Sequence, residues 1–260
     1  MRQIILAINA LLKFKAYTLI NVLGLACSLA CVLTVARYIH QENTVNQCFP
    51  EYKRICLIKT STSSGENFLG GYRSGLEKNP DVEQFTVIYQ ISDMPVLFGE
   101  QEIAANAFSV DSTFFKIFPY RVIAGSGRIV RPRDVVITRS FWKKKLGGKN
   151  AIGATFKNTK ANKFTIIGVV DDPDTKTSWM PDIFMSDELD EFLFFDPIYA
   201  MLMAPDTDIA LLNKKYSKEH PRSKWSTYET VRYQYLPLKD LYLSLIHISE
   251  PTRQEASRMP

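Results

Sequence analysis

An uncharged apolar run near the N-terminus constrains this 260-residue chain more than any other feature. Between Ala16 and Ala36, 21 consecutive residues carry no charge. A helix of that length spans roughly 30 Å, the thickness of the hydrocarbon core of a bilayer. Tyr17 and Tyr38 bracket the run, where amphipathic rings favour the membrane interface. The sequence therefore predicts a transmembrane helix over residues 16–38.

The charges that flank this run predict its orientation. Arg2, Lys13 and Lys15 precede it, and Arg37 and Glu42 follow it. Because Lys and Arg accumulate on the cytoplasmic side, we expect the N-terminus in the cytoplasm and residues 39–242 across the membrane. Residues 1–15 are predicted to form a cytoplasmic amphipathic elbow. Its apolar stripe consists of Ile4, Ile5, Ile8, Leu11 and Leu12.

Three alternatives to a membrane anchor remain open for this segment. A cleaved signal peptide has a shorter apolar region that ends at a small-residue site. A lipoprotein signal would use Cys27 or Cys31, although both are preceded by poor matches to its pattern. The third alternative is a buried core helix, which would be unusually long and apolar on every face. Small residues at Gly24 and Ser28 have the spacing that lets another membrane helix approach closely.

Composition excludes several classes of protein. Hydrophobic residues make up 46% of the chain and aromatic residues 12%, which is ample for a packed core and excludes a disordered protein. A mean hydropathy of -0.10 excludes a polytopic membrane protein within these 260 residues. The net charge of +5 is too weak an argument for a nucleic-acid partner.

The remainder of the chain predicts an α+β domain. Alternating and β-branched runs predict strands. These lie at 53–60, 84–91, 96–98, 103–110, 135–138, 164–170, 183–185 and 198–203. Short helices are expected from Asp111 to Phe118, from Ser140 to Leu146 and from Pro205 to Lys218, where capping residues and charges suit both ends.

The residues that carry enzyme chemistry do not assemble into a known pattern. Of three histidines, only His220 belongs to the predicted domain. There is no Gly-x-Ser-x-Gly elbow and no phosphate-binding loop, so we expect no enzyme activity, no catalytic residues and no cofactor. Asp171, Asp172 and Asp174 lack the remaining ligands of a calcium loop and are interpreted as a solvated turn, so no metal site is predicted. Whether Cys48 and Cys56 form a disulfide is left open.

Several segments, in order along the chain, resemble one family. They begin with 17–25 (YTLINVLGL), continue with 49–56 (FPEYKRIC), 108–118 (FSVDSTFFKIF), 132–138 (PRDVVIT), 145–153 (KLGGKNAIG) and 164–170 (FTIIGVV), and end with 235–243 (YLPLKDLYL). Together they resemble the MacB/FtsX-like permeases of ABC transporters, in the versions abundant in Bacteroidetes. Lys53, Cys56 and Ala151 depart from the family's usual residues.

The resemblance implies a MacB-like periplasmic domain of two parts over residues 39–242. A porter-like part would use both ends, and a β-rich subdomain would occupy about 109–175. It also implies a bacterial inner-membrane permease with a cytoplasmic ABC ATPase partner, a homodimer or pseudo-dimer, contact with membrane lipid and a periplasmic adaptor. The permease would couple ATP hydrolysis to periplasmic movement, for export or mechanotransmission. The alternative is a single-pass, membrane-anchored periplasmic sensor or binding protein.

Residues 243–260 are expected to be foreign to the protein. The stretch from Leu243 to Arg253 resembles the translation of a transposase sequencing adapter over eleven consecutive codons. We therefore expect a permease truncated near Tyr242, with three further membrane helices beyond that residue in the natural gene.

Overall fold

The computed structural model describes residues 13–62, 67–69, 79–148, 150–187, 197–216, 220–221 and 230–242. Most of the expected elbow, the polar loop at 63–65 and the tail 243–260 lie outside these residues. The chain divides into two compact units, Met1–Thr44 and Val45–Pro260.

The first unit contains the helix α2, Lys15–Asn43, which is long and apolar enough to cross a membrane. No residue of α2 is buried, which disfavours the core-helix alternative. Two of its hydroxyl groups bond within the helix, because Ser28 Oγ donates to Gly24 O at 2.9 Å and Thr34 Oγ1 to Ala30 O at 2.8 Å. The helix surface is therefore compatible with lipid. A signal sequence has the same position and character, so that alternative needs the test given below.

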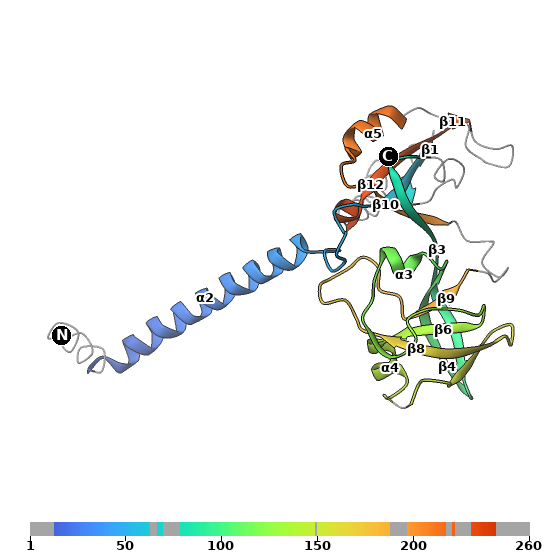
Figure 1. Cartoon of the computed structure of the whole chain (residues 1–260). Helices are drawn as coiled ribbons and strands as arrows, with labels where there is room; N and C mark the ends of the chain where they lie inside the picture. Colours follow the sequence, from blue (N-terminus) through green and yellow to red (C-terminus); the bar gives the residue numbers. More distant parts are fainter. Residues whose placement is uncertain are drawn as a thin grey trace, which may run out of the picture. The chain divides into compact units, whose positions relative to one another are not determined.

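The second unit is built on one twelve-stranded sheet (Figure 1). Its strands are β1 (Ile55–Thr62), β2 (Asn67–Leu69), β3 (Val82–Phe98), β4 (Gln101–Val110), β5 (Val122–Gly125), β6 (Asp134–Thr138), β7 (Thr155–Asn158), β8 (Lys163–Val170), β9 (Ile183–Ser186), β10 (Ile198–Met203), β11 (His220–Pro221) and β12 (Thr230–Pro237). The main strand order is β11-β12-β1-β10-β3-β4-β9-β6-β8-β5. Three short helices accompany them: α3 (Phe114–Ile117), α4 (Arg139–Lys145) and α5 (Ile209–Tyr216).

Part of this sheet closes on itself. The strand β7 pairs with β8 and also with β3, at Val96↔Asn158 and Leu97↔Lys157. The strands β3, β4, β9, β6, β8 and β7 therefore form a closed ring. Apolar side chains such as Phe156 and Phe164 fill it, and α4 contributes Phe141. We call this ring the barrel.

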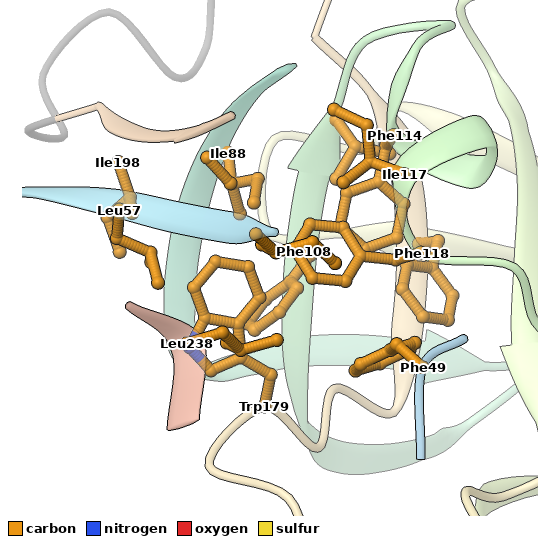
Figure 2. Packing of buried hydrophobic residues seen from close by; sticks show 14 of the residues in the cluster. Phe49, Leu57, Ile88, Phe108, Phe114, Ile117, Phe118, Trp179, Ile198 and Leu238 are labelled. Carbon is orange, nitrogen blue, oxygen red and sulfur yellow. The ribbon is translucent and has the colours of Figure 1, made fainter. Parts of the chain in front are cut away.

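The other half is an antiparallel sheet of β12, β1, β10 and the first part of β3. The helix α5 packs on one face through Leu212, over a cluster that includes Cys56 and Met201. A second cluster lies on the opposite face (Figure 2), where Phe108, Phe118 and Trp179 meet. The strand β3 joins the two halves through an irregularity between Ile91 and Met94.

Local sequence explains the helix ends. Thr138 caps α4 by accepting from Phe141 N, and Gly147 follows the helix with φ 65°. The helix α5 begins at Ile209, later than the expected Pro205, because Asp208 Oδ1 accepts from Ala210 N and Leu211 N and so starts the helix there. The α+β class predicted from the sequence is confirmed.

Candidate functional site

The described residues contain no cluster of three His, Cys, Asp or Glu side chains that could hold a metal ion. His220 lies in β11, where its backbone pairs with Val231, and its side chain is outside the described part. The candidate sites are therefore polar networks that hold segments of the second unit together.

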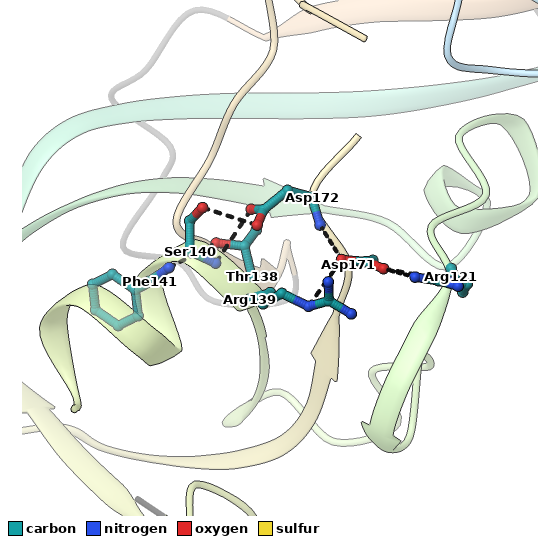
Figure 3. A network of polar contacts seen from close by, with 7 residues as sticks. All are labelled: Arg121, Thr138, Arg139, Ser140, Phe141, Asp171 and Asp172. Carbon is teal, nitrogen blue, oxygen red and sulfur yellow. Dashed lines mark hydrogen bonds and ion pairs between the residues drawn. The ribbon is translucent and has the colours of Figure 1, made fainter. Parts of the chain in front are cut away.

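The three aspartates interpreted as a solvated turn are not all solvated. Asp171 is largely buried, and its carboxylate accepts from Arg121 Nε at 3.0 Å and pairs with Arg139 Nε at 3.0 Å (Figure 3). The Arg121 guanidinium, through its hydrogen bond to Asp171, holds the pKa of that carboxyl below its ordinary value. Asp174 is exposed. The expectation of a solvated turn was wrong for Asp171, because arginines distant in sequence surround it.

Asp172 completes this network from the neighbouring position. Its carboxylate accepts from Ser140 Oγ at 2.8 Å and from Ser140 N at 3.3 Å, in the first turn of α4. The Asp171 backbone N–H also donates to Arg121 O at 2.8 Å. The network therefore links the end of β8 to the start of α4 and to the residue that precedes β5. Its role is structural, since every carboxylate in it has protein donors.

The two cysteines of the second unit are free thiols. Cys56 lies in the cluster beneath α5, whereas Cys48 packs against the cluster on the opposite face of the sheet. Burial raises the pKa of Cys56 to about 12 and also raises the pKa of Cys48. Neither thiol therefore has the thiolate character of a nucleophile.

A second polar network joins the start of the second unit to residues 176–178 and 238–242, and we call it the junction. Asn46 is its centre, fully buried and with a left-handed φ of 65°. Its Nδ2 donates to Leu238 O at 3.0 Å and to Ser178 Oγ at 3.1 Å. Its Oδ1 accepts from Ser178 N at 2.8 Å and from Thr177 Oγ1 at 2.9 Å. One side chain thus ties its own segment to two others, which lie 131 to 192 residues later in the sequence.

Further contacts strengthen the junction. Asn46 N donates to Lys176 O at 2.9 Å, and Lys176 Nζ donates to the Tyr242 hydroxyl at 2.9 Å. Beneath these bonds lies an aromatic cluster in which the Phe118 ring stands 4.9 Å from Phe49 and 5.2 Å from Trp179. Leu238 and Leu241 belong to the same cluster (Figure 2).

This arrangement resists relative movement of the segments that it joins. The segment that continues from α2 and the segment around 238–242 are hydrogen-bonded through one buried amide, so neither can shift without breaking those bonds. A buried donor or acceptor left without a partner costs about 1–3 kcal/mol. The junction is therefore expected to move as one piece. Sequence analysis did not identify Asn46, and its only local signal was an Asn after a helix, a residue type that tolerates left-handed φ.

Comparisons with known proteins agree with this architecture. The sequence model of the MacB-like periplasmic core domain matches residues 18–215. The chain belongs to this family. The match begins in the first turn of α2, and it includes the segments that resembled MacB/FtsX-like permeases except residue 17 and the segment 235–243. The MacB-like fold is therefore shown, while a Bacteroidetes origin remains a prediction.

Solved structures share the MacB-like fold at low sequence identity. A domain of a permease protein from Porphyromonas gingivalis superposes with a TM-score of 0.58 and 17% identity, over 73% of this chain and 91% of that one. The periplasmic region of MacB from Actinobacillus actinomycetemcomitans gives 0.54 and 14%, over 77% and 95%. No curated protein matches the chain in sequence. The family is a component of transporter permeases, and an apolar helix before the domain fits a membrane-anchored protein.

Proposed function

We propose that the chain is the permease subunit of a MacB/FtsX-like ABC transporter. In this proposal, ATP hydrolysis by a separate cytoplasmic ATPase moves the membrane segments, and the MacB-like domain converts that movement into a periplasmic conformational change. The observation that carries the proposal is the junction, where Asn46 bonds the segment after α2 to Ser178 and Leu238.

The remaining parts of the proposal concern topology and partners. The N-terminus lies on the cytoplasmic side of a bacterial inner membrane. Lys13 and Lys15 support this orientation, because basic residues accumulate on that side. Two permeases, as a homodimer or pseudo-dimer, assemble with the ATPase, and a periplasmic adaptor contacts the outer domain. The domain itself is divided into a porter-like part and a β-rich subdomain at about 109–175. The substrate has no recognisable motif in this sequence.

We also propose that residues 243–260, which resemble a sequencing adapter, are foreign to the natural protein. Their match to adapter codons supports a permease that continues past Tyr242 in the natural gene. Sequencing the genomic locus across the codon for Tyr242 tests this directly. Codons for about three apolar segments are expected, whereas a natural stop codon after Tyr242 would contradict the permease and favour the single-pass sensor.

The functional test is a coupling experiment on the permease encoded at that locus, reconstituted in nanodiscs with the ATPase encoded beside it. Hydrogen exchange over residues 176–182 and 238–242 is expected to change when ATP is added. The variant Asn46→Gly keeps the left-handed backbone but removes the four side-chain bonds. It should leave the ATPase rate within about twofold and abolish most of the ATP-dependent change in exchange.

The matched control is Asn213→Ala. Asn213 makes an equivalent pair of bonds to Tyr235, at 2.9 Å and 2.7 Å, but holds α5 to β12 away from the junction. It should retain the ATP-dependent change. If both variants lose the change equally, the junction has no special part in coupling. If the wild-type complex shows no ATP-dependent change at all, the mechanotransmission proposal fails.

A further inference from the structure

The chain between β5 and β6 forms a loop that crosses β8, because these two strands lie on opposite sides of β8. We call residues 126–133 the crossing loop. A Cβ added to Gly168 would overlap the backbone oxygen of Ser126, so the loop begins against Gly168. At the other end, Arg133 O accepts from Thr165 N at 2.9 Å. Gly168 and Thr165 are about 10 Å apart along β8, so the loop occupies one small area of the surface.

Contacts within the domain hold the crossing loop in shape. Ser126 Oγ donates to Arg128 O and accepts from Arg128 N, both at 3.1 Å. Ile129 packs inward against the aromatic cluster of Figure 2. Arg131 N donates to Asp134 Oδ2 at 3.2 Å, and Asp134 N donates to Arg131 O at 2.9 Å. A surface that is ordered before it binds a partner loses less conformational entropy on binding.

Apolar side chains are exposed in the loop and beside its start. Val130 is 78% exposed, and Val122 and Ile152 are 45% and 39% exposed. A Cβ added at Gly127 would lie 2.5 Å from Val122 Cγ2, and one added at Gly125 would lie 2.8 Å from Ile152 Cδ1. Val122 and Ile152 therefore both adjoin the turn that begins the loop. In the described part of the second unit, only two other large apolar side chains are exposed.

The charged groups around the loop are almost all arginines. From Pro119 to Arg139 the chain has five Arg, no Lys and one acidic residue. The acidic residue is Asp134, which is buried. Three of the arginines lie in the loop and are exposed, at positions 128, 131 and 133.

Two of these three arginines have no counter-ion among the residues that the structure describes. Arg131 pairs with Asp134 at 3.2 Å. Arg133 donates to the neutral Asn162 at 3.4 Å. The Arg128 side chain is exposed and makes no bond within the described part of the chain. The loop therefore presents unneutralised positive charge on both sides of the exposed Val130.

This combination favours a protein partner with acidic and apolar side chains. Arg is enriched at protein–protein interfaces and Lys is depleted there. The guanidinium fork also matches the two oxygens of a carboxylate. Lys160 and Lys163, in the turn and strand on either side of Asn162, add positive charge at the Arg133 end of the loop.

Two other kinds of contact are disfavoured at this surface. The strand β5 is a poor template for an added strand, because it has four residues and an irregularity between Val122 and Ala124. A symmetric contact with a second copy of the chain would place the same patch on both sides. Arginines would then face arginines, and like charges repel.

We propose that the crossing loop, with Val122 and Ile152, docks a segment of another protein that carries acidic residues beside apolar side chains. Val130 supplies the apolar contact, and Arg128 and Arg133 pair with carboxylates. Eight residues are fewer than a standard interface uses on each side, so the contact belongs to the weak, reversible class. This proposal does not depend on coupling to an ATPase.

The test uses the full chain in nanodiscs of phosphatidylcholine and a phage-displayed library of random short peptides. Peptides that bind empty nanodiscs are removed first. The peptides then selected by the chain are expected to be enriched in Asp and Glu together with Leu, Val or Phe. Synthetic copies with a fluorescent label give dissociation constants by anisotropy.

Matched double variants test the charged contacts. Arg128→Gln with Arg133→Gln should weaken binding of the selected peptides on the order of tenfold. Lys53→Gln with Lys239→Gln removes the same charge from exposed positions outside the loop and should change binding less than about twofold. Arg131 is left unchanged, because its bond to Asp134 holds the loop.

A second pair of variants tests the apolar contact. Val130→Ser should weaken binding about fivefold, because it removes apolar area that the peptide would cover. Leu211→Ser, at a position 65% exposed on α5, should leave binding unchanged. Neither substitution should alter thermal unfolding, since both side chains are exposed.

Several results would overturn the proposal. A selection that yields no peptide, or peptides without acidic residues, would exclude this kind of partner. Equal losses in the two double variants would show a response to net charge alone, and an unchanged Val130→Ser would exclude the apolar contact. Association between nanodiscs that the loop variants abolish would identify a second copy as the partner. Binding to phosphatidylglycerol vesicles that is tighter than peptide binding and lost in the same variants would identify lipid.

Discussion

Asp171 stabilises the MacB-like domain at a point where three segments meet. It lies directly after β8, accepts from Arg121 at 3.0 Å and pairs with Arg139 at 3.0 Å. Both arginines are more exposed than the carboxylate, with 75% and 37% of their side chains accessible against 11% for Asp171. The interaction therefore depends on the charge of a shielded carboxylate held by two solvated cations.

This arrangement predicts a dependence of stability on pH. The pKa of Asp171 is lowered in the folded domain, so its ion pairs are fully formed above the unfolded value of about 3.9 and are lost as pH falls through the folded value. Asp171→Asn should lower the melting temperature at pH 7, and the difference from wild type should shrink steadily below about pH 4. Thermal unfolding of the full chain in detergent, followed by tryptophan fluorescence, measures this. Asp174→Asn, at an exposed position nearby, should have little effect at either pH.

The residues of both networks show what sequence could and could not predict. The short helix after Asp111 was predictable, because Asp111 Oδ1 accepts from Thr113 N and Phe114 N within three residues. Asn46 was not, because its partners are 131 to 192 residues away and only the folded sheet brings them together. Asp171 was misinterpreted for the same reason, since Arg121 lies 50 residues earlier.

Among the elements, the pairing of β5 with β8 depends on two glycines. Gly125, with φ 69°, pairs in register with Gly168. A Cβ on Gly168 would overlap the backbone oxygen of Ser126, and one on Gly125 would overlap that of Ile167. Because backbone atoms surround both positions, the close approach of these strands requires glycine. This explains the glycine in the segment 164–170 that resembled the family.

Gly168→Ala is therefore expected to separate β5 from β8. The cost should be about 2–3 kcal/mol of unfolding free energy, as for other overpacked sites. Hydrogen exchange should increase at Val122–Gly125, while the ring closed by β7 stays protected. Gly147→Ala is the control for backbone strain without a steric clash, because its φ of 65° is left-handed, as at Gly125, but nothing lies within 4 Å of the added Cβ. It should cost only about 1 kcal/mol, and an equal cost in both variants would contradict the steric argument.

Most strands expected from alternation appear in the structure, including β8, β9 and β10. The strands not anticipated were β2, β5, β7, β11 and β12, together with the continuous length of β3. The strand β7, which pairs with both β3 and β8, has four residues. A strand of that length is too short to show a recognisable alternation of apolar and polar residues. β12 packs Tyr235 into the cluster under α5, but its sequence mixes polar and aromatic residues without a clear boundary. Ring closure depends on long-range pairing, which local patterns do not encode.

At the scale of the whole domain, charge is separated along β3. Asp81 and Glu83 lie at its start, and the β10–α5 turn with Asp206 approaches there, because Ala204 N donates to Asp81 O at 2.9 Å. The opposite end of β3, at Phe98, contacts Phe156, which belongs to the segment between Ser112 and Val170, where the net charge is +12. A strand of 17 residues spans roughly 55 Å, so the two charges are well beyond a Debye length apart at physiological salt.

The location of the MacB-like domain across the membrane is the last prediction. Leu211 is 65% exposed on α5, and Lys13 precedes α2. A membrane-impermeant maleimide applied to intact spheroplasts should modify Leu211→Cys, because that residue faces outward, and should modify Lys13→Cys only after permeabilisation. Labelling of the chain without either substitution measures the background reaction of its own cysteines. Cys56 is buried and is not expected to contribute to that background.

Each alternative for α2 gives a different result in that experiment. The reverse labelling pattern would contradict the positive-inside argument. A signal peptide would be removed, so the Leu211→Cys chain would be shorter by the mass of the apolar segment and would leave the membrane fraction in high salt. A membrane anchor retains the full mass and stays with the membrane, since the uncharged segment Ala16–Ala36 holds it there by apolar burial and not by charge.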